Sequence, residues 1–550
     1  MTARLARPRR PGRLGELGHA AVCTLGLLAA CGGGGSGGGS STLPPPLDAT
    51  YRASGKSSAG DVFVHLFEWR WVDIARECET FLGPVGYAAV QISPPSEHAV
   101  ITSGVGYPWW QRYQTVSYKL DQSRSGTLAE FSDMVSRCNA AGVKIYADAV
   151  INHMTAGAGV GSAGSSYTKS SYPAVPWSAG NFHAGCGVTN YADAANVQLC
   201  ELVGLADLRT EDDAVRSRIA AYLIALHAEG VAGFRIDAAK HMQPRDVDAI
   251  VSQVNAAAAA AGRALPYFFL EVINNAGEAV TAAQYFGVGY ASGGAADVTD
   301  FQYGYRLTDA FTGRGGATLA SLQALTNGLL PSDKGIVFVD NHDNQRGENL
   351  YYASTTVAGA PVYDLATVFM LAHPHGAPSV MSSYGFDRGT PSGRDTGPPG
   401  ANGVTQSTFD AGATRCTRTL GSAQVGSWIC EHRLGAIAGM VAFRKATVGA
   451  PLSGCGRSNW PIGNDPNRIA FCRDGKGFVA LSLSGVAAPT NLPTTLPDGN
   501  YCNIAQFTYQ PALGAAAASC SGPAVSVTGG AALINLPANG AVVLHIDARL

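Results

Sequence analysis

The feature that most constrains the fold of this chain is a repeated alternation between short β-rich runs and helical stretches, which begins near residue 61. Eight β-rich runs can be distinguished: 61–67, 87–92, 143–151, 233–237, 267–272, 297–301, 335–343 and 379–383. Strands that alternate with helices form a parallel sheet built from βα units. Eight such units predict an α/β fold, the closed (β/α)8 TIM barrel.

Two interruptions of the alternation predict further domains. The segment 154–206 is rich in glycine, serine and tyrosine and is too long for an ordinary βα loop, so we expect a small inserted domain there. After residue 447 the helical pattern gives way to short runs separated by glycine and proline. We therefore predict a barrel over 61–153 and 207–447, followed by a C-terminal antiparallel β-sandwich over 448–550.

The first 31 residues resemble an export signal. Five arginines among the first thirteen residues precede an apolar stretch at 20–30, which is shorter than the ~20 residues that span a bilayer. The stretch ends in Leu-Ala-Ala-Cys-Gly, similar to a bacterial lipobox, in which the cysteine carries a lipid. We interpret 1–31 as a lipoprotein-type signal peptide and 32–60 as a Gly/Ser/Pro-rich linker. This predicts a cell-envelope lipoprotein anchored to a membrane at Cys31; the alternative is an ordinary cleaved signal and a secreted protein.

Composition restricts the class of partner. Hydrophobic residues occupy 46% of the 550 positions and charged residues 14%, which favours a large packed core. The net charge of −2 leaves no basic surplus to neutralise phosphates. We expect no nucleic-acid partner, and we expect a monomer.

The cysteines predict disulfides rather than a metal site. Of twelve cysteines, Cys23 and Cys31 lie in the signal, and the remaining even set contains no C-x-x-C pair. Four of the expected bridges close short loops, and the first joins more distant elements. The expected pairs are Cys78 with Cys138, Cys186 with Cys200, Cys416 with Cys430, Cys455 with Cys472, and Cys502 with Cys520.

Carboxylates stand where three predicted strands end. The two-residue period of a strand puts Arg235 and Asp237 on one face, while Glu271 and Asp343 follow apolar runs. These strand ends meet at the C-terminal rim of a barrel, which carries the active site. A single carboxylate is more often a structural ion pair or a helix cap. A converging set can supply the proton donor and the nucleophile that hydrolysis of a glycosidic bond requires.

Four motifs carry a resemblance to a known family. They are 64–69 (VHLFEW), 148–153 (DAVINH), 233–241 (GFRIDAAKH) and 338–345 (FVDNHDNQ). In this order they resemble the motifs of α-amylases, closest to the animal-type branch of that glycoside hydrolase family. The resemblance runs from about residue 61 to the C-terminus. It implies endo-hydrolysis of α-1,4-glucosidic bonds in starch and glycogen, with the inserted segment as the family's B domain.

The resemblance also implies site residues. Asp237 matches the nucleophile, Glu271 the general acid/base, and Asp343 the carboxylate that supports the transition state. We expect Arg235 to lower the pKa of Asp237, and apolar flanks to keep Glu271 protonated. The positions that match substrate-binding residues are Trp109, Trp110, Tyr113, Gln114, His153, Arg235, Lys240, His241 and His342.

A structural calcium ion is implied between the barrel and the inserted domain. Asn152 and Asp207 match its side-chain ligands, and the carbonyls of Gln198 and His241 match its backbone ligands. Ligation by oxygen alone suits this hard cation.

Three departures from the animal-type pattern are visible. A chloride site there uses two arginines and an asparagine; Arg235 and Asn341 are present, but Ser379 stands at the second arginine position. This puts chloride binding in doubt. Asp121 stands where one more cysteine is expected, and the loop 348–350 lacks the usual histidine and glycines.

Two other functions are compatible with these motifs. A transglycosylating or oligosaccharide-forming relative would share the covalent intermediate and transfer it to a sugar. A non-catalytic starch-binding lipoprotein would keep the barrel for binding alone, although the presence of all three carboxylates argues against it.

Overall fold

The computed structural model describes residues 62–347, 361–410, 413–416, 425–506, 520 and 522–550. Eight parallel strands close into a barrel in the order β1-β12-β11-β10-β9-β8-β5-β2. Each of these strands overlaps one of the eight predicted β-rich runs, so the predicted TIM barrel is confirmed. The strands are β1 (Phe63–Leu66), β2 (Ala89–Ile92), β5 (Lys144–Ala149), β8 (Gly233–Ile236), β9 (Tyr267–Leu270), β10 (Asp297–Thr299), β11 (Gly335–Val337) and β12 (Ala377–Ser382).

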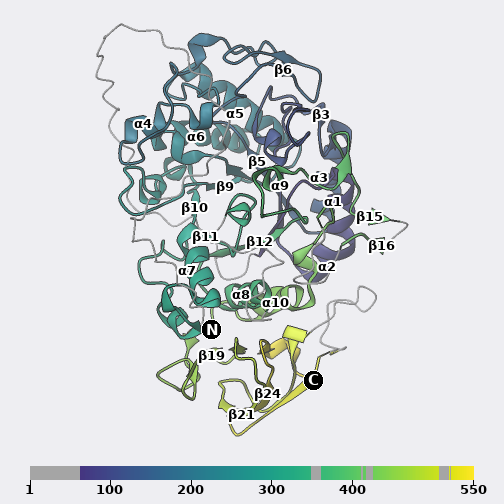
Figure 1. The fold of residues 1–550 in the computed structure, drawn as a ribbon, viewed down its shortest axis with the longest axis vertical. Helices are drawn as coiled ribbons and strands as arrows, with labels where there is room; N and C mark the ends of the chain where they lie inside the picture. The colour runs from purple at the N-terminus through teal and green to yellow at the C-terminus, as the bar shows by residue number, and fades with distance from the viewer. Residues whose placement is uncertain (1–61, 348–360, 411–412, 417–424, 507–519, 521) are drawn as a thin grey trace, which may run out of the picture. The chain divides into compact units, whose positions relative to one another are not determined.

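Helices surround these strands (Figure 1). Their N-termini carry recognisable signals: Thr127 and Glu130 form a capping box at α3, and Pro244 occupies the first turn of α6. The helices are α1 (Trp71–Glu77), α2 (Gly83–Val85), α3 (Leu128–Ala140), α4 (Ala194–Gln198), α5 (Asp213–Ala228), α6 (Pro244–Ala260), α7 (Phe301–Thr312), α8 (Val362–Ala372), α9 (Pro391–Asp395) and α10 (Gly435–Ala446). No helix of the described residues is long and apolar enough to cross a membrane.

The alternation of side chains along each strand divides the core in two. In β1, Val64 and Leu66 join the large cluster that includes the helices, while Phe63 packs inside the barrel. The rings of Phe63 and Phe269 lie 5.5 Å apart there. His65 occupies the next inward position, closer to the C-terminal rim, and is also buried. The barrel interior is therefore apolar at its base and polar toward the rim.

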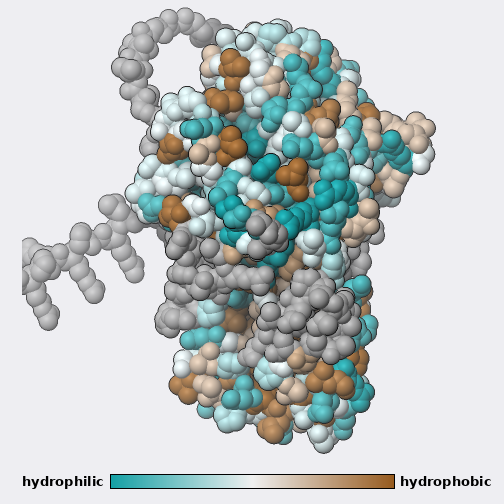
Figure 2. Space-filling model, turned by 90° about the vertical axis from the view of Figure 1, so that its right-hand side faces the viewer, coloured by the Kyte–Doolittle hydropathy of each residue, from teal (hydrophilic) through white to brown (hydrophobic). Residues whose placement is uncertain are grey.

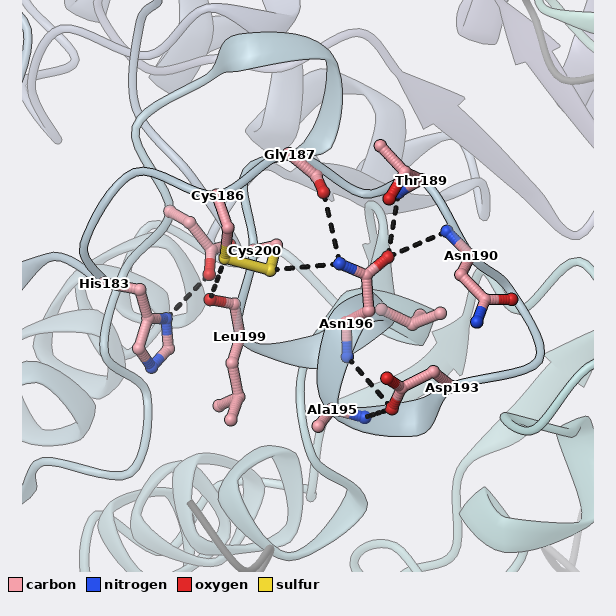
Figure 3. Close-up of a disulfide and its surroundings, with 12 residues drawn as sticks. His183, Cys186, Gly187, Thr189, Asn190, Asp193, Ala195, Asn196, Leu199 and Cys200 are labelled. Atoms are coloured by element: carbon pink, nitrogen blue, oxygen red, sulfur yellow. Dashed lines mark hydrogen bonds and ion pairs between the residues drawn. A yellow bond between two sulfur atoms is a disulfide. The ribbon is translucent and has the colours of Figure 1, made fainter. Parts of the chain in front are cut away.

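The segment between β5 and α5 leaves the barrel, as the glycine-rich sequence predicts. It contains the hairpin of β6 (Gly159–Val160) and β7 (Ser166–Tyr167), the helix α4, and the Cys186–Cys200 disulfide. Figure 3 shows Asn196 beside this disulfide, where its amide group accepts from Thr189 N and donates to Gly187 O. The loop is thus held by a covalent bond and by local hydrogen bonds.

The C-terminal region forms two antiparallel sheets. One contains β17 (Leu452–Ser453), β18 (Pro461–Ile462), β19 (Asp465–Arg473), β20 (Gly477–Ser482) and β25 (Ala541–His545). The other contains β21 (Ala488–Pro493), β22 (Gly499–Cys502), β23 (Ala524–Thr528) and β24 (Ala531–Leu536). A separate core cluster draws on both sheets, including Phe478 from the first and Ile534 from the second. This is the predicted sandwich.

All five predicted disulfides are present. Cys78–Cys138 spans 60 residues and joins the end of α1 to α3, whereas the other four span 14 to 18 residues. The loop at 348–350 and the lipid-attachment position Cys31 lie outside the described residues.

Candidate active site

The strand register brings the predicted catalytic carboxylates together. Ile236 in β8 pairs with Leu270 in β9, so Asp237 and Glu271 follow at neighbouring positions on the rim. The backbone N–H of Glu271 donates to the carbonyl of Ile236 at 3.0 Å, which fixes this relation. Asp343 directly precedes the short helix Asn344–Arg346 in the turn that follows β11, and so lies on the same rim.

A single guanidinium group links three carboxylates. Arg235 Nη1 lies 2.6 Å from Asp148 Oδ1 and 2.9 Å from Asp237 Oδ1, and Nη2 lies 2.6 Å from Glu271 Oε1. The second oxygen of Glu271 accepts a hydrogen bond from Ala238 N at 2.8 Å. Tyr113 Oη donates to Asp148 Oδ2 at 2.9 Å. Each carboxylate therefore has a fixed orientation.

Burial dominates the electrostatics of this cluster. It raises the pKa of Asp237 well above its ordinary value, while Arg235 acts in the opposite direction and Glu271 and Asp148 raise it further. Arg235 thus lowers the pKa of Asp237 as expected, but burial has the larger effect. Three buried carboxyl groups around one cation favour retention of a proton within the cluster.

Asp343 differs from the other two carboxylates. Its side chain is 47% exposed, and Oδ2 lies 3.2 Å from Nε2 of His342. Its backbone N–H donates to Asn341 Oδ1 at 3.1 Å, so Asn341 shapes the turn that presents it. Asp343 is therefore open to a ligand on the rim.

Aromatic side chains form one wall beside the carboxylates. Tyr113 stacks on His342 with ring centroids 4.9 Å apart and planes within 6°, and the ring of Trp109 meets both edge-on. Trp109 and Trp110 begin the short helix Trp109–Tyr113 and are partly exposed. Such faces can stack on the apolar faces of sugar rings.

The remaining predicted binding residues lie around this wall. His153 Nε2 contacts Tyr113 O at 3.0 Å, and His241 Nδ1 contacts Val197 O at 2.9 Å. Burial lowers the pKa of each to about 4, so both imidazoles are neutral near pH 7. Gln114 Oε1 accepts from Ala156 N at 3.3 Å.

The ammonium group of Lys240 already has partners. It pairs with Glu278, donates to Ile273 O at 2.7 Å and lies 4.9 Å from the ring centroid of Tyr191. A sugar that contacts Lys240 would therefore also meet Glu278.

The predicted calcium ligands lie on adjoining segments. His153 and Asp207 form an antiparallel bridge, and Leu208 N donates to Asn152 O at 3.0 Å. Oδ1 of Asn152 and Oδ1 of Asp207 are both buried, with no hydrogen-bond partner among the described residues. The segments of Gln198 and His241 also meet, because Gln198 Nε2 donates to Met242 O at 3.3 Å.

This donor set fits calcium. Oδ1 of Asn152 and Oδ1 of Asp207 are buried and accept no hydrogen bond from the described residues, and a hard cation could bind both oxygens. Within the described ranges, no group of three or more His, Cys, Asp or Glu side chains could hold a metal ion, so a calcium site here would depend on amide and carbonyl oxygens besides Asp207.

A small cavity of about 30 Å³ lies inside the barrel next to the carboxylate cluster. Arg235, Asn341 and Ser379 line it, together with the inward-facing His65. It has room for about one water-sized species. A larger cavity of about 600 Å³, lined by Lys144 and Tyr267 among others, involves the opposite ends of the strands and none of the predicted site residues.

Some residues of the site were not singled out from the sequence. Asp148 lies within a recognised motif, and its inward position in β5 could have marked it as a partner of Arg235. His183, which lies 2.7 Å from Asp207 Oδ2, and Arg346, which contacts the aromatic wall, gave no sequence signal because their partners are distant along the chain.

Comparisons with known proteins agree with this geometry. The family model "Alpha amylase, C-terminal all-beta domain" matches residues 462–547. The chain is 46% identical to an α-amylase of Thermomonospora curvata, over 89% of this chain and 74% of that one. It is 44% identical to the pancreatic α-amylase of Sus scrofa, over 82% and 87%.

A solved structure extends the likeness to three dimensions. A variant of α-amylase I from Eisenia fetida, in complex with maltohexaose, superposes with a TM-score of 0.76 at 36% identity, covering 90% of this chain and 99% of that one. Identity at this level over most of both chains establishes common descent and a common fold. The chain therefore belongs to the α-amylase family and is a starch-hydrolysing glycoside hydrolase.

Proposed function

We propose that the chain cleaves internal α-1,4-glucosidic bonds of starch and glycogen with retention of anomeric configuration, with Asp237 as nucleophile and Glu271 as acid/base. The observation that carries this assignment is the contact of both carboxylates with one guanidinium group, which keeps them close together on the rim. Retaining enzymes need carboxyl groups ~5–5.5 Å apart, whereas inverting enzymes leave room for a water between them.

The reaction proceeds in two steps. Glu271 donates its proton to the glycosidic oxygen while Asp237 attacks the anomeric carbon, so the bond to the leaving sugar breaks and a glycosyl ester forms. Glu271 then takes a proton from water, which attacks the same carbon and releases Asp237. Asp343, exposed on the rim, binds the distorted sugar and stabilises the oxocarbenium-like transition state.

We propose the aromatic wall as the surface that orients the glucan. The partly exposed rings of Trp109 and Trp110 stack on glucose units, and His153, His241, His342 and Gln114 surround the sugar nearest the carboxylates. The maltohexaose bound to the Eisenia fetida relative supports a glucan ligand of this kind.

Catalytic roles are tested with conservative variants. Asp237→Asn and Glu271→Gln should each lower kcat on soluble starch by roughly a thousandfold or more, because each removes a reacting group without a change in volume. Reducing-sugar release measures this. Asp246→Asn, which alters a buried carboxylate in the first turn of α6 that pairs with Arg216 and not with Arg235, is the matched control and should retain activity. Near-normal turnover of either variant would contradict the assignment.

Retention has its own test. Proton NMR of the first product should show the α-anomer before mutarotation; an initial β-anomer would exclude the double displacement.

We further propose a structural calcium ion held by Asn152, Asp207 and the carbonyls of Gln198 and His241. The two unpartnered buried oxygens support this site. Bound there, calcium would supply positive charge that fixes the segments after β5 and before α5 relative to each other.

Localisation and assembly are also proposed. The lipobox-like segment supports an envelope lipoprotein anchored at Cys31. Apolar residues on the face in Figure 2 occur in small separate groups, which supports a monomer.

A further inference from the structure

One buried cation near the active site lies outside the mechanism described above. Arg346 ends the short helix Asn344–Arg346, three residues after Asp343, and is only 6% exposed. Among the described residues, no carboxylate lies within ion-pair distance of its guanidinium group. An unpaired buried cation is costly, so its other contacts have to compensate for the lost hydration.

Three oxygen acceptors hold the guanidinium group. Arg346 donates to the carbonyl of His342, to Arg394 O from Nε at 3.1 Å, and to the hydroxyl of Tyr384 from Nη2 at 3.0 Å. These acceptors belong to the turn after β11, to α9 and to the segment after β12. One side chain therefore joins three separate parts of the rim.

Aromatic rings surround the same group. Its central carbon lies 4.4 Å from the ring centroid of Phe386, 4.6 Å from that of Trp109 and 5.2 Å from that of Phe67. Trp109 Nε1 also donates to Arg394 O, at 3.0 Å, so Trp109 and Arg346 share an acceptor. Arg346 therefore fixes the orientation of the Trp109 indole in two ways: its guanidinium group lies over the ring face, and both side chains donate to the same carbonyl.

We propose that Arg346 is a positioning residue that fixes the turn carrying Asp343 and the indole of Trp109 relative to each other. The inference rests on the roles given above to Asp343 and Trp109. A sugar bound between them meets a preorganised carboxylate on one side and a preorganised aromatic face on the other. Lysine cannot replace this function, because an ammonium group lacks the planar fork that reaches three acceptors while it stacks on rings.

The primary test is Arg346→Lys, assayed on a soluble maltooligosaccharide. We expect kcat to fall and KM to rise, with kcat/KM lower by roughly ten- to a hundredfold, because small misplacements of reacting groups have effects of this size. Arg433→Lys is the matched control: Arg433 is also buried, pairs with Glu77 and lies 4.4 Å from the ring centroid of Phe81, with no contact to the site residues. It should lower the Tm but leave kcat and KM within about twofold of wild type.

A milder variant covers the case in which Arg346→Lys does not fold. Tyr384→Phe removes one acceptor and keeps the ring, and it should lower kcat/KM several-fold in the same direction. In the Trp109→Phe background, the effect of either variant should shrink, because the two residues act as a unit.

Two results would overturn the inference: unchanged kcat and KM in a folded Arg346 or Tyr384 variant, or an equal loss in Arg433→Lys. Wild-type activity in the same assay tests the proposed function separately.

Discussion

Arg235 shows how a single residue can organise an active site and also restrict its ligands. Its guanidinium group already contacts Asp148, Asp237 and Glu271, so its positive charge is more than neutralised. Ser379 lines the adjoining cavity of about 30 Å³ at the position where the animal-type pattern has a second arginine. Ser379 contributes a neutral hydroxyl there and no positive charge. An anion placed there would meet a net negative environment.

We therefore expect turnover to be insensitive to chloride. The measurement is kcat on soluble starch after exhaustive dialysis against a halide-free buffer, followed by titration with sodium chloride and, as the control for ionic strength, sodium sulfate. A saturable rise in kcat specific to chloride, with a shift of the alkaline limb of the pH profile, would show that the inference from Ser379 is wrong.

Glu431 makes stability depend on pH. It is fully buried, accepts from Ser383 N at 2.7 Å, and burial raises its pKa to about 8, with a further contribution from Asp364. A carboxyl whose folded-state pKa lies above its unfolded value stabilises the fold at low pH, and this contribution is lost as pH rises from about 4.5 to 8. The slope is at most about 1.4 kcal/mol per pH unit.

Glu431→Gln should accordingly reduce the loss of Tm between pH 5.5 and 8.5. Part of the loss should persist, because burial also raises the pKa of Asp364, to about 7. Glu77 provides the contrast: its net pKa shift is downward, because His432 and Arg433 outweigh its burial, so its contribution to stability is lost only as pH falls below about 4.5. Glu77→Gln should therefore leave the Tm slope between pH 5.5 and 8.5 unchanged. An unchanged Tm slope in Glu431→Gln would contradict the assignment.

At the scale of elements, the eight strands could be predicted because β-rich composition and helical alternation are local signals. The residues at which these strands end could not be predicted in the same way. The run 335–343 contributes only Gly335–Val337 to the sheet, because Asn341 then accepts hydrogen bonds from Asp343 N and Asn344 N and starts a turn. Asp237 and Glu271 were predicted to converge on one rim, and both contact Arg235 there. The surroundings of Arg346 could not be predicted, because they include residues as distant along the chain as Phe67 and Trp109.

The junction between β5 and the inserted segment carries the calcium prediction. Removal of calcium with a chelator should lower the Tm by several degrees, because a ligand that binds only the native state stabilises it by mass action. Asn152→Ala and Asp207→Asn should abolish the difference between calcium-loaded and chelated samples in differential scanning fluorimetry.

Asp193→Asn is the matched control for this junction. Asp193 accepts from Ala195 N at the start of α4, and the side-chain oxygen of asparagine can keep this helix cap, so the variant should keep the calcium response. An identical Tm with and without chelator in the wild-type chain would count against a bound ion.

At the scale of the whole molecule, β19 joins the C-terminal sheets to the barrel, because its side chains alternate between the two core clusters. Ala470 and Cys472 of β19 face the sandwich core, while Phe471 between them packs on Phe369 of α8 with ring centroids 5.7 Å apart. Arg473 donates to Ala372 O at 3.2 Å. The β domain therefore supports the barrel from the side of α8, and the proposed catalytic residues lie on other elements.

Attachment of the whole molecule to a membrane is predicted to depend on one atom, the sulfur of Cys31. The apolar stretch 20–30 is too short to anchor the chain by itself, so a lipid on Cys31 has to provide the membrane affinity. Cys31→Ser should abolish incorporation of radiolabelled fatty acid and shift starch-hydrolysing activity from the membrane fraction to the soluble fraction. Cys23→Ser, which alters the other cysteine of the signal, should leave both unchanged. Because the proposed catalytic residues come after the linker 32–60, we expect the kcat of the released Cys31→Ser protein to equal that of the anchored form. Lipid labelling or membrane retention of the Cys31→Ser protein would refute the anchor.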